Sequence, residues 1–137
     1  MRLTAGTAIG GLVVLLLLMQ VIVPARTNPV SDPALTFRAA RPGAEAAAAI
    51  FERSCRDCHS NATVWPWYSR IAPVSWLVAH DVSEGRSELN LSEFGRYTPE
   101  RQQHKLEEAC EAVRSGEMPM WIHTLAHPEA RLQPGDV

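Results

Sequence analysis

Residues 44–60 read AEAAAAIFERSCRDCHS, a run of helix-forming residues that leads directly into two cysteines and a histidine. Alanine has the strongest helix preference of any residue, and Pro42 suits the first position of a helix. The run therefore predicts a helix over residues 43–54. The cysteines and the histidine follow that helix with the spacing C-x-x-C-H, so the helix presents a compact group of reactive side chains at its end.

The C-x-x-C-H spacing is the one at which two thiols attach to the vinyl groups of haem while the adjacent histidine ligates the iron. Cys55 and Cys58 are therefore candidates for covalent attachment of one haem c, and His59 is the candidate proximal iron ligand. A structural zinc site usually needs a second pair of ligands, and no second C-x-x-C is present. A thioredoxin-like dithiol would require a βαβ setting, whereas the surrounding pattern indicates helices and loops.

Two further helices are predicted downstream. Apolar residues recur at helical spacing over residues 73–84, and Gly85 is a natural stop. One short helical turn is expected after Ser92. Thr98 is a good N-cap for a longer helix that ends at Gly116. Prolines beyond that glycine leave little room for another helix, and no strand pattern is visible, so the predicted class is all-α.

The N-terminal residues 3–23 are uncharged and almost wholly apolar. As one helix these 21 residues would span about 31 Å, close to the thickness of a bilayer. Residues 1–24 are therefore expected to form a transmembrane anchor, with cleavage as a signal segment as the alternative. Residues 25–42 are expected to be a proline-rich linker, and residues 43–137 the folded domain.

The charge of the chain excludes one class of partner. Its formal net charge is -2, with 20% charged residues, which argues against a nucleic-acid binder. Arginines follow the apolar segment in greater number than they precede it, which by itself would keep the domain in the cytoplasm. Covalent haem attachment takes place outside the cytoplasm in bacteria, and this requirement outweighs the count of arginines.

The residue on the opposite face of the iron decides between electron transfer and ligand binding. Met118 is the favoured distal ligand, because it lies in a loop after the last predicted helix and a loop can bring sulfur to the second haem face. The other candidates are Met120, His80, His104, His123 and His127.

Several other residues carry expectations about the site. The aromatic residues near the motif are expected to wall the haem, and arginines are candidates for pairing with its propionates, with solvated surface charge as the alternative. Cys110 is expected to be a buried small apolar residue. The aromatic set is Trp65, Trp67, Tyr68 and Trp76, and the arginine set is Arg70, Arg86 and Arg96.

The stretch CRDCHSNATVWPWYSRIAPVSWLVAHDVSEGRSELNLSEF at residues 55–94, with GEMP at 116–119 and HPEARL at 127–132, resembles the small cytochrome c-like haem-binding domain of bacterial membrane-anchored proteins. This resemblance implies haem c, with His59 as the proximal and Met118 as the distal iron ligand. Relatives continue into a further C-terminal helix, whereas this chain stops at RLQPGDV, so a full C-terminal helix is not expected.

These observations favour an electron carrier over an enzyme. The expected function is one-electron transfer by a c-type cytochrome at the periplasmic side of the bacterial inner membrane, with unidentified redox proteins as partners and no small-molecule substrate. A soluble periplasmic form after cleavage is the alternative location. The alternative function is a peroxidase-like haem enzyme, or a gas or redox sensor, with an open or displaceable distal position.

Overall fold

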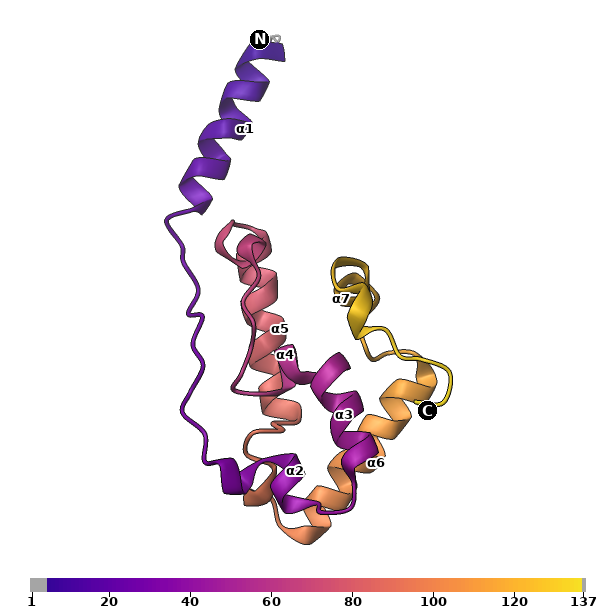
Figure 1. Ribbon diagram of the computed structural model, residues 1–137. Coiled ribbons are helices and arrows are strands. Elements are labelled where there is room, and N and C mark those ends of the chain that lie inside the picture. The colour runs from indigo at the N-terminus through magenta and orange to yellow at the C-terminus, as the bar shows by residue number, and fades with distance from the viewer. Residues whose placement is uncertain (1–4, 137) are drawn as a thin grey trace. The chain divides into compact units, whose positions relative to one another are not determined.

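The computed structural model describes residues 5–136, and every regular element in that range is a helix (Figure 1). This confirms the predicted all-α class. The α-helices are α1 (Ala5–Met19), α2 (Phe37–Ala40), α3 (Glu45–Ser54), α4 (Arg56–His59), α5 (Val74–Glu88), α6 (Pro99–Ser115) and α7 (Trp121–Ala126). Short 3-10 helices form at η1 (Pro33–Leu35), η2 (Trp67–Arg70), η3 (Phe94–Arg96) and η4 (Pro128–Ala130).

These helices fall into two compact units. Within the described range, the first unit contains residues 5–26 and 65–81, and the second contains residues 27–64 and 82–136. Helix α5 contributes its first half to the first unit and its second half to the second. The complete C-x-x-C-H motif and Met118 belong to the second unit.

Helix α1, in the first unit, is shorter than the helix predicted over residues 3–23, of which residues 3 and 4 lie outside the described range. The residue that follows the last position of α1 contacts another segment of the same unit. The amide of Gln20 donates to the Ala72 carbonyl (3.1 Å) and accepts from the Ala72 N–H (3.0 Å). Within residues 5–136, no helix has the length and apolar character needed to cross a membrane.

The predicted helices next to the motif are confirmed with small shifts at their ends, as α3, α5 and α6. The N-cap of α6 is Thr98, whose hydroxyl oxygen accepts from the Arg101 N–H at 3.3 Å. The helix ends at Gly116, which has the left-handed conformation (φ 77°) that glycine adopts at low cost. The expectation of no helix after Gly116 was wrong, because α7 forms there. Its neighbouring prolines, Pro119 and Pro128, lie before and after the helix and so do not interrupt it.

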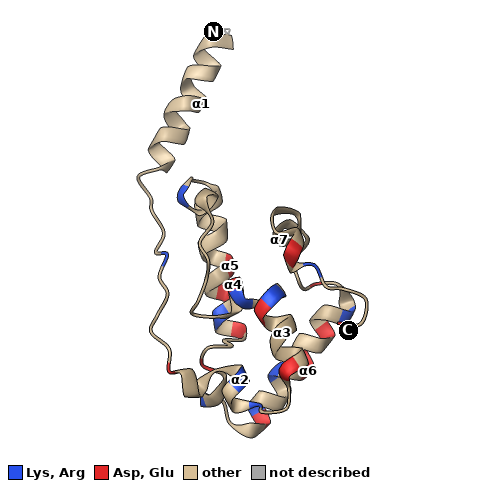
Figure 2. Ribbon diagram, in the orientation of Figure 1, with Lys and Arg blue, Asp and Glu red and all other residues tan. Residues whose placement is uncertain are grey.

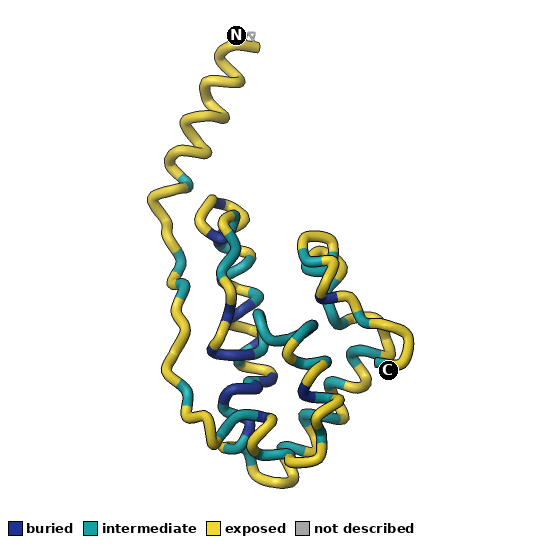
Figure 3. Tube along the Cα trace, in the orientation of Figure 1, coloured by how far each residue is buried: buried dark blue, intermediate teal, exposed yellow. Residues whose placement is uncertain are grey.

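The core of the second unit is an aromatic and aliphatic cluster whose buried residues are dark blue in Figure 3. Phe94 is completely buried, and its ring meets that of Phe37 edge to face with centroids 5.0 Å apart. Phe37 meets Phe51 of α3 in the same way at 4.9 Å. Such edge-to-face pairs add to the stabilisation from burial alone. This cluster holds α2, η3 and α3 together.

The stretch expected to be a linker, residues 25–42, contains η1 and α2, and its residues from 27 onward belong to the second unit. Phe37 belongs to the core, and its N–H donates to the Leu91 carbonyl at 2.8 Å. Farther upstream, the Asn28 amide donates to the Thr63 carbonyl at 2.9 Å. Much of this proline-rich stretch is therefore ordered against the domain, because its few apolar and amide side chains find partners there.

Candidate haem-binding site

The C-x-x-C-H motif forms one helical turn directly after α3. The Cys55 N–H donates to the Phe51 carbonyl at 3.0 Å, and the His59 N–H donates to the Cys55 carbonyl at 2.9 Å. Residues four apart on a helix share one face. The motif turn therefore directs Cys55 and His59 to the same side, and both side chains line one cavity.

This cavity, called here the motif cavity, has a volume of about 330 Å³, within the usual range for ligand pockets. Its apolar part includes small residues of α6, Ala109 and Ala112, which leave room for a flat group. Met118 lies on the same cavity, although it is distant from His59 in sequence. The complete lining is Phe51, Cys55, His59, Glu88, Leu89, Lys105, Glu108, Ala109, Ala112, Val113, Glu117 and Met118.

Met118 is positioned by the end of α6. After the left-handed Gly116 the chain turns back, and the Met118 N–H donates to the Ala112 carbonyl at 3.0 Å. Among the six residues considered as distal ligands, Met118 alone contributes to the described lining of the motif cavity. The others include His104, which is paired with Glu108 at 3.2 Å on the exposed face of α6.

The His59 ring is held in the orientation that an iron ligand needs. Its Nδ1 lies 3.1 Å from the Leu89 carbonyl oxygen. A carbonyl can only accept, so Nδ1 carries the proton and Nε2 keeps a free lone pair. Burial lowers the pKa of His59, which favours the neutral imidazole. Metal-binding histidines commonly donate their second nitrogen in this manner.

The two cysteines differ from those of a redox dithiol. Both are in the free thiol form. Burial, and secondarily the neighbouring Cys58, raises the pKa of Cys55 to about 11, so its thiol stays protonated at neutral pH. Catalytic dithiols instead have a cysteine of lowered pKa. Cys55 is therefore not the activated thiol that disulfide exchange requires.

By spacing alone, a second pair of zinc ligands could come from His123 of α7 and His127 directly after it, which form an H-x-x-x-H pair. Their rings stack with centroids 4.9 Å apart, and His127 also contacts Glu129 at 3.2 Å. Residues 5–136 contain no group of three or more His, Cys, Asp or Glu side chains arranged to hold a metal ion. The side chains at the motif cavity suit a cofactor that brings its own metal ligands.

The prediction that Gly85 ends the helix was wrong, because Gly85 lies inside α5 at the point where the helix touches the motif turn. A Cβ atom at this position would lie 2.7 Å from the Cys58 carbonyl oxygen. The helix continues to Glu88, which allows its last turn and the following Leu89 to reach the motif cavity. The absence of a side chain at Gly85 is therefore what permits this close approach.

Replacing Gly85 with alanine is expected to lower the free energy of unfolding by about 2 kcal/mol, because the new methyl group overlaps a backbone atom that cannot move easily. In an open helix the same change would stabilise by about 1 kcal/mol. Denaturant unfolding of the haem-loaded protein measures the difference. Ser83→Ala, an exposed change in the same helix, is the control and should be nearly neutral. An equally stable Gly85→Ala protein would contradict this close packing.

Arg86 is half-buried and hydrogen-bonded within the chain, so its interpretation as a solvated surface charge was wrong. Its guanidinium donates to the Ser60 carbonyl (2.7 Å), the Thr63 hydroxyl (2.8 Å) and the Thr27 carbonyl (2.9 Å). It also donates to the side chain of Asn28 at 3.1 Å. Arg86 thereby joins the segment after the motif to the segment before η1. These acceptors within the chain engage four of the five N–H donors of Arg86, and pairing with a propionate stays a prediction.

The other residues with site expectations are not among those that line the motif cavity. Cys110 is exposed, which corrects the prediction of burial, because the side of α6 that carries Ala109 and Val113 is the one that faces the cavity. Arg96 is exposed and paired with Glu93. The predicted aromatic wall belongs to the first unit, together with Arg70 and His80, and its role remains a prediction.

Sequence reasoning missed the charged residues of the motif cavity. Lys105 of α6 lies in its lining, with Nζ 2.8 Å from the Glu108 carboxylate and 3.4 Å from that of Glu88. Along α6 acidic and basic residues are mixed (Figure 2), so nothing in the sequence distinguishes Lys105 from a solvated surface lysine. The position of Lys105 in the cavity lining is evident only in the folded structure, where α5 and α6 pack together.

A helical fold in which a C-x-x-C-H turn, a neutral histidine and a methionine meet at one cavity defines a small haem-binding domain. The chain belongs to the haem-binding domain family, which matches residues 14–137. This confirms the family resemblance drawn from residues 55–94 and the expectation of haem as cofactor. No curated protein and no solved structure matches the chain.

Proposed function

We propose that the protein is a c-type cytochrome that carries one electron at a time and transforms no substrate. Cys55 and Cys58 would hold haem c through two thioether bonds, with His59 as the proximal and Met118 as the distal iron ligand. The observation that carries the proposal is the presence of Cys55, His59 and Met118 on one cavity of about 330 Å³. When bound, haem supplies an iron centre that alternates between the ferric and ferrous forms.

The residues that line the motif cavity have different roles in the proposed function. Leu89 fixes His59 through its carbonyl, so that Nε2 points away from the protein hydrogen bond and can ligate a metal. The thioether of Met118 offers a soft second ligand, and a filled distal position favours electron transfer over binding of small molecules. The apolar side chains of Leu89 and Val113 exclude water from part of the cavity, which also influences a redox potential.

The periplasmic side of the bacterial inner membrane is the proposed location, with redox proteins as partners. Attachment of haem to Cys55 and Cys58 outside the cytoplasm supports this location. The anchor is supported by the apolar composition of residues 3–23 alone. A soluble periplasmic form after cleavage remains the alternative.

Replacing Met118 with alanine is expected to convert the haem-loaded protein from six-coordinate to five-coordinate or water-ligated iron. The reduced variant should bind carbon monoxide readily, whereas the unmodified protein should bind it slowly or not at all. The reduction potential should fall, because a thioether ligand favours ferrous iron. Absorption spectra before and after carbon monoxide, with a redox titration, measure these changes.

Met120→Ala is the matched control, because Met120 lies near Met118 but does not line the motif cavity, and its spectrum should be unchanged. Ready binding of carbon monoxide by the unmodified protein, together with an unchanged Met118→Ala spectrum, would overturn the carrier proposal in favour of a haem enzyme or sensor. Loss of haem on denaturation would overturn covalent attachment. Cys55→Ala and Cys58→Ala should each leave a single thioether bond.

A further inference from the structure

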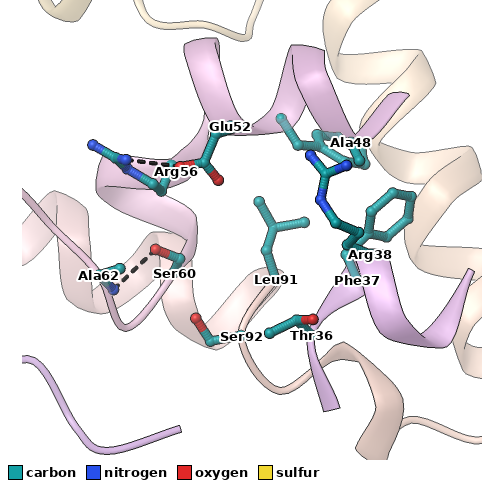
Figure 4. Close-up of a pocket in the computed structure, with 11 residues that line it drawn as sticks. Thr36, Phe37, Arg38, Ala48, Glu52, Arg56, Ser60, Ala62, Leu91 and Ser92 are labelled. Carbon is teal, nitrogen blue, oxygen red and sulfur yellow. Dashed lines mark hydrogen bonds and ion pairs between the residues drawn. The ribbon is translucent and has the colours of Figure 1, made fainter. Parts of the chain in front are cut away.

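The second unit contains another cavity, called here the arginine cavity, with a volume of about 280 Å³ (Figure 4). It lies between α2, α3, the motif turn and the segment at Leu91. None of Cys55, His59 and Met118 lines it, and of the residues around the two cavities Phe51 alone is shared. The complete lining is Thr36, Phe37, Arg38, Ala48, Phe51, Glu52, Arg56, Ser60, Ala62, Leu91 and Ser92.

The apolar part of the arginine cavity comes from the core. Phe37, Ala48 and Leu91 are buried residues of the aromatic cluster, and Phe51 packs against them. Phe37 and Phe51 are held by the edge-to-face ring contacts described above, so this part of the apolar surface is fixed. Figure 4 shows Leu91 and Phe37 projecting toward the same space as the polar residues around it. An apolar molecular body could bury its surface there.

Two arginines supply positive charge at this cavity. Arg38 is exposed, and its side chain makes no hydrogen bond or ion pair with any residue in the described range 5–136. Figure 4 shows its guanidinium extending past Ala48 beside the cavity. Arg56 donates through Nη1 to Glu52 at 2.7 Å, while its Nε is buried without a hydrogen bond in this part of the chain. The guanidinium groups therefore retain unused donors.

Two buried hydroxyl groups add neutral donors. The oxygen of Ser60 accepts from the Ala62 N–H, and that of Ser92 accepts from the Asn61 N–H, both at 3.0 Å. Each hydroxyl also has one proton to donate, and neither finds an acceptor among residues 5–136. A buried donor without a partner is costly, so an acceptor supplied by a ligand would be stabilising.

From this arrangement we propose that the arginine cavity binds a small organic monocarboxylate with an apolar body. Of the two arginines in the lining, Arg56 is already paired with Glu52 and lies near Asp57, so Arg38 is the one left to pair with a single carboxylate. A dianion such as phosphate would meet Glu52 and also Asp57, whose carboxylate lies 3.7 Å from Arg56. The carboxylate accepts from Arg38 and the serine hydroxyls, and the body covers Phe37 and Leu91.

The test titrates the full-length, haem-loaded protein with benzoate, with its neutral analogue benzamide and with inorganic phosphate, followed by calorimetry and by amide NMR shifts. Benzoate is expected to bind saturably and at least about tenfold more tightly than the other two, as the loss of one charge-assisted hydrogen bond predicts. The NMR shifts should centre on residues 36–38 and 91–92. The haem absorption spectrum should not change, because the motif cavity is separate.

Two variants keep the test specific. Arg38→Gln should weaken benzoate binding about tenfold, whereas Arg114→Gln, which removes an exposed arginine outside the cavity, should leave it unchanged. Ala62→Leu, at an exposed lining position, should obstruct binding without altering the core. Equal affinity for benzamide, tighter binding of phosphate, or no effect of Arg38→Gln would overturn the proposal. Binding that occurs only without haem, or that alters the haem spectrum, would overturn it too.

Discussion

Truncating Phe94 to alanine is expected to lower the free energy of unfolding by about 4 kcal/mol, the cost typical of removing a buried phenyl ring. Phe94 is fully buried and contacts the rings of Phe37 and Tyr97. The surrounding side chains could fill the void left by the truncation only by breaking their contacts with one another. A small domain has about 5 kcal/mol of stability to lose, and the variant should therefore be largely unfolded near body temperature.

Guanidinium unfolding of the haem-loaded protein, followed by circular dichroism, measures this loss. Trp121→Ala is the control, because Trp121 is 74% exposed and its truncation should change stability by less than about 0.5 kcal/mol. Phe94→Leu should retain more than half of the stability that Phe94→Ala loses, because leucine fills part of the volume of the phenyl ring. A loss below about 1 kcal/mol for Phe94→Ala would show that the second unit is organised around other residues.

Replacing Arg86 with methionine is expected to lower the free energy of unfolding by about 3 kcal/mol, because a charged group that makes several hydrogen bonds is lost while its acceptors remain. The Ser60 carbonyl and the Thr63 hydroxyl are the acceptors closest to the motif turn. Methionine preserves the aliphatic stem, so the change tests hydrogen bonding more than packing. Amide hydrogen exchange should also increase at residues 27–31, which Arg86 helps to retain.

Arg96→Met is the matched control, since Arg96 is 64% exposed in its side chain and forms one surface ion pair with Glu93, worth less than about 1 kcal/mol. Arg86→Lys should recover part of the stability but not all of it, because an ammonium group cannot reproduce the planar fork of a guanidinium. Equal stability of the Arg86→Met and Arg96→Met proteins would contradict the role of Arg86 as a link between segments.

The helices α3, α5 and α6 could be predicted because their signals are local. Alanine content, the Thr98 cap and the left-handed glycine at position 116 act within a few residues of one another. Gly85 shows where such signals fail. Glycine is a helix stop when considered alone, but here α5 continues through it because the missing side chain admits the Cys58 carbonyl. The Cys58 carbonyl belongs to another segment of the chain, so residues next to Gly85 in the sequence cannot reveal this contact.

The site residues also differ in whether a local sequence signal identifies them. Cys55, Cys58 and His59 are recognisable because their chemistry depends on spacing within one turn, and Met118 was the favoured distal ligand from its loop and from family resemblance. The charged residues around Lys105 were not recognisable, since a lysine between glutamates looks the same on any solvated helix. Arg86 likewise looked like a surface charge until the segments that it joins were brought together.

The all-helical class, the helices α3, α5 and α6 and the haem-binding character can be inferred from the amino-acid sequence, because they depend on residues close together in the chain. The folded arrangement is needed to see that Met118 and His59 line one cavity, that Leu89 orients the histidine, and that a second cavity carries unpartnered arginine and serine donors. Each of these depends on contacts between distant segments. Their geometry is set by packing of the whole second unit, which no local preference encodes.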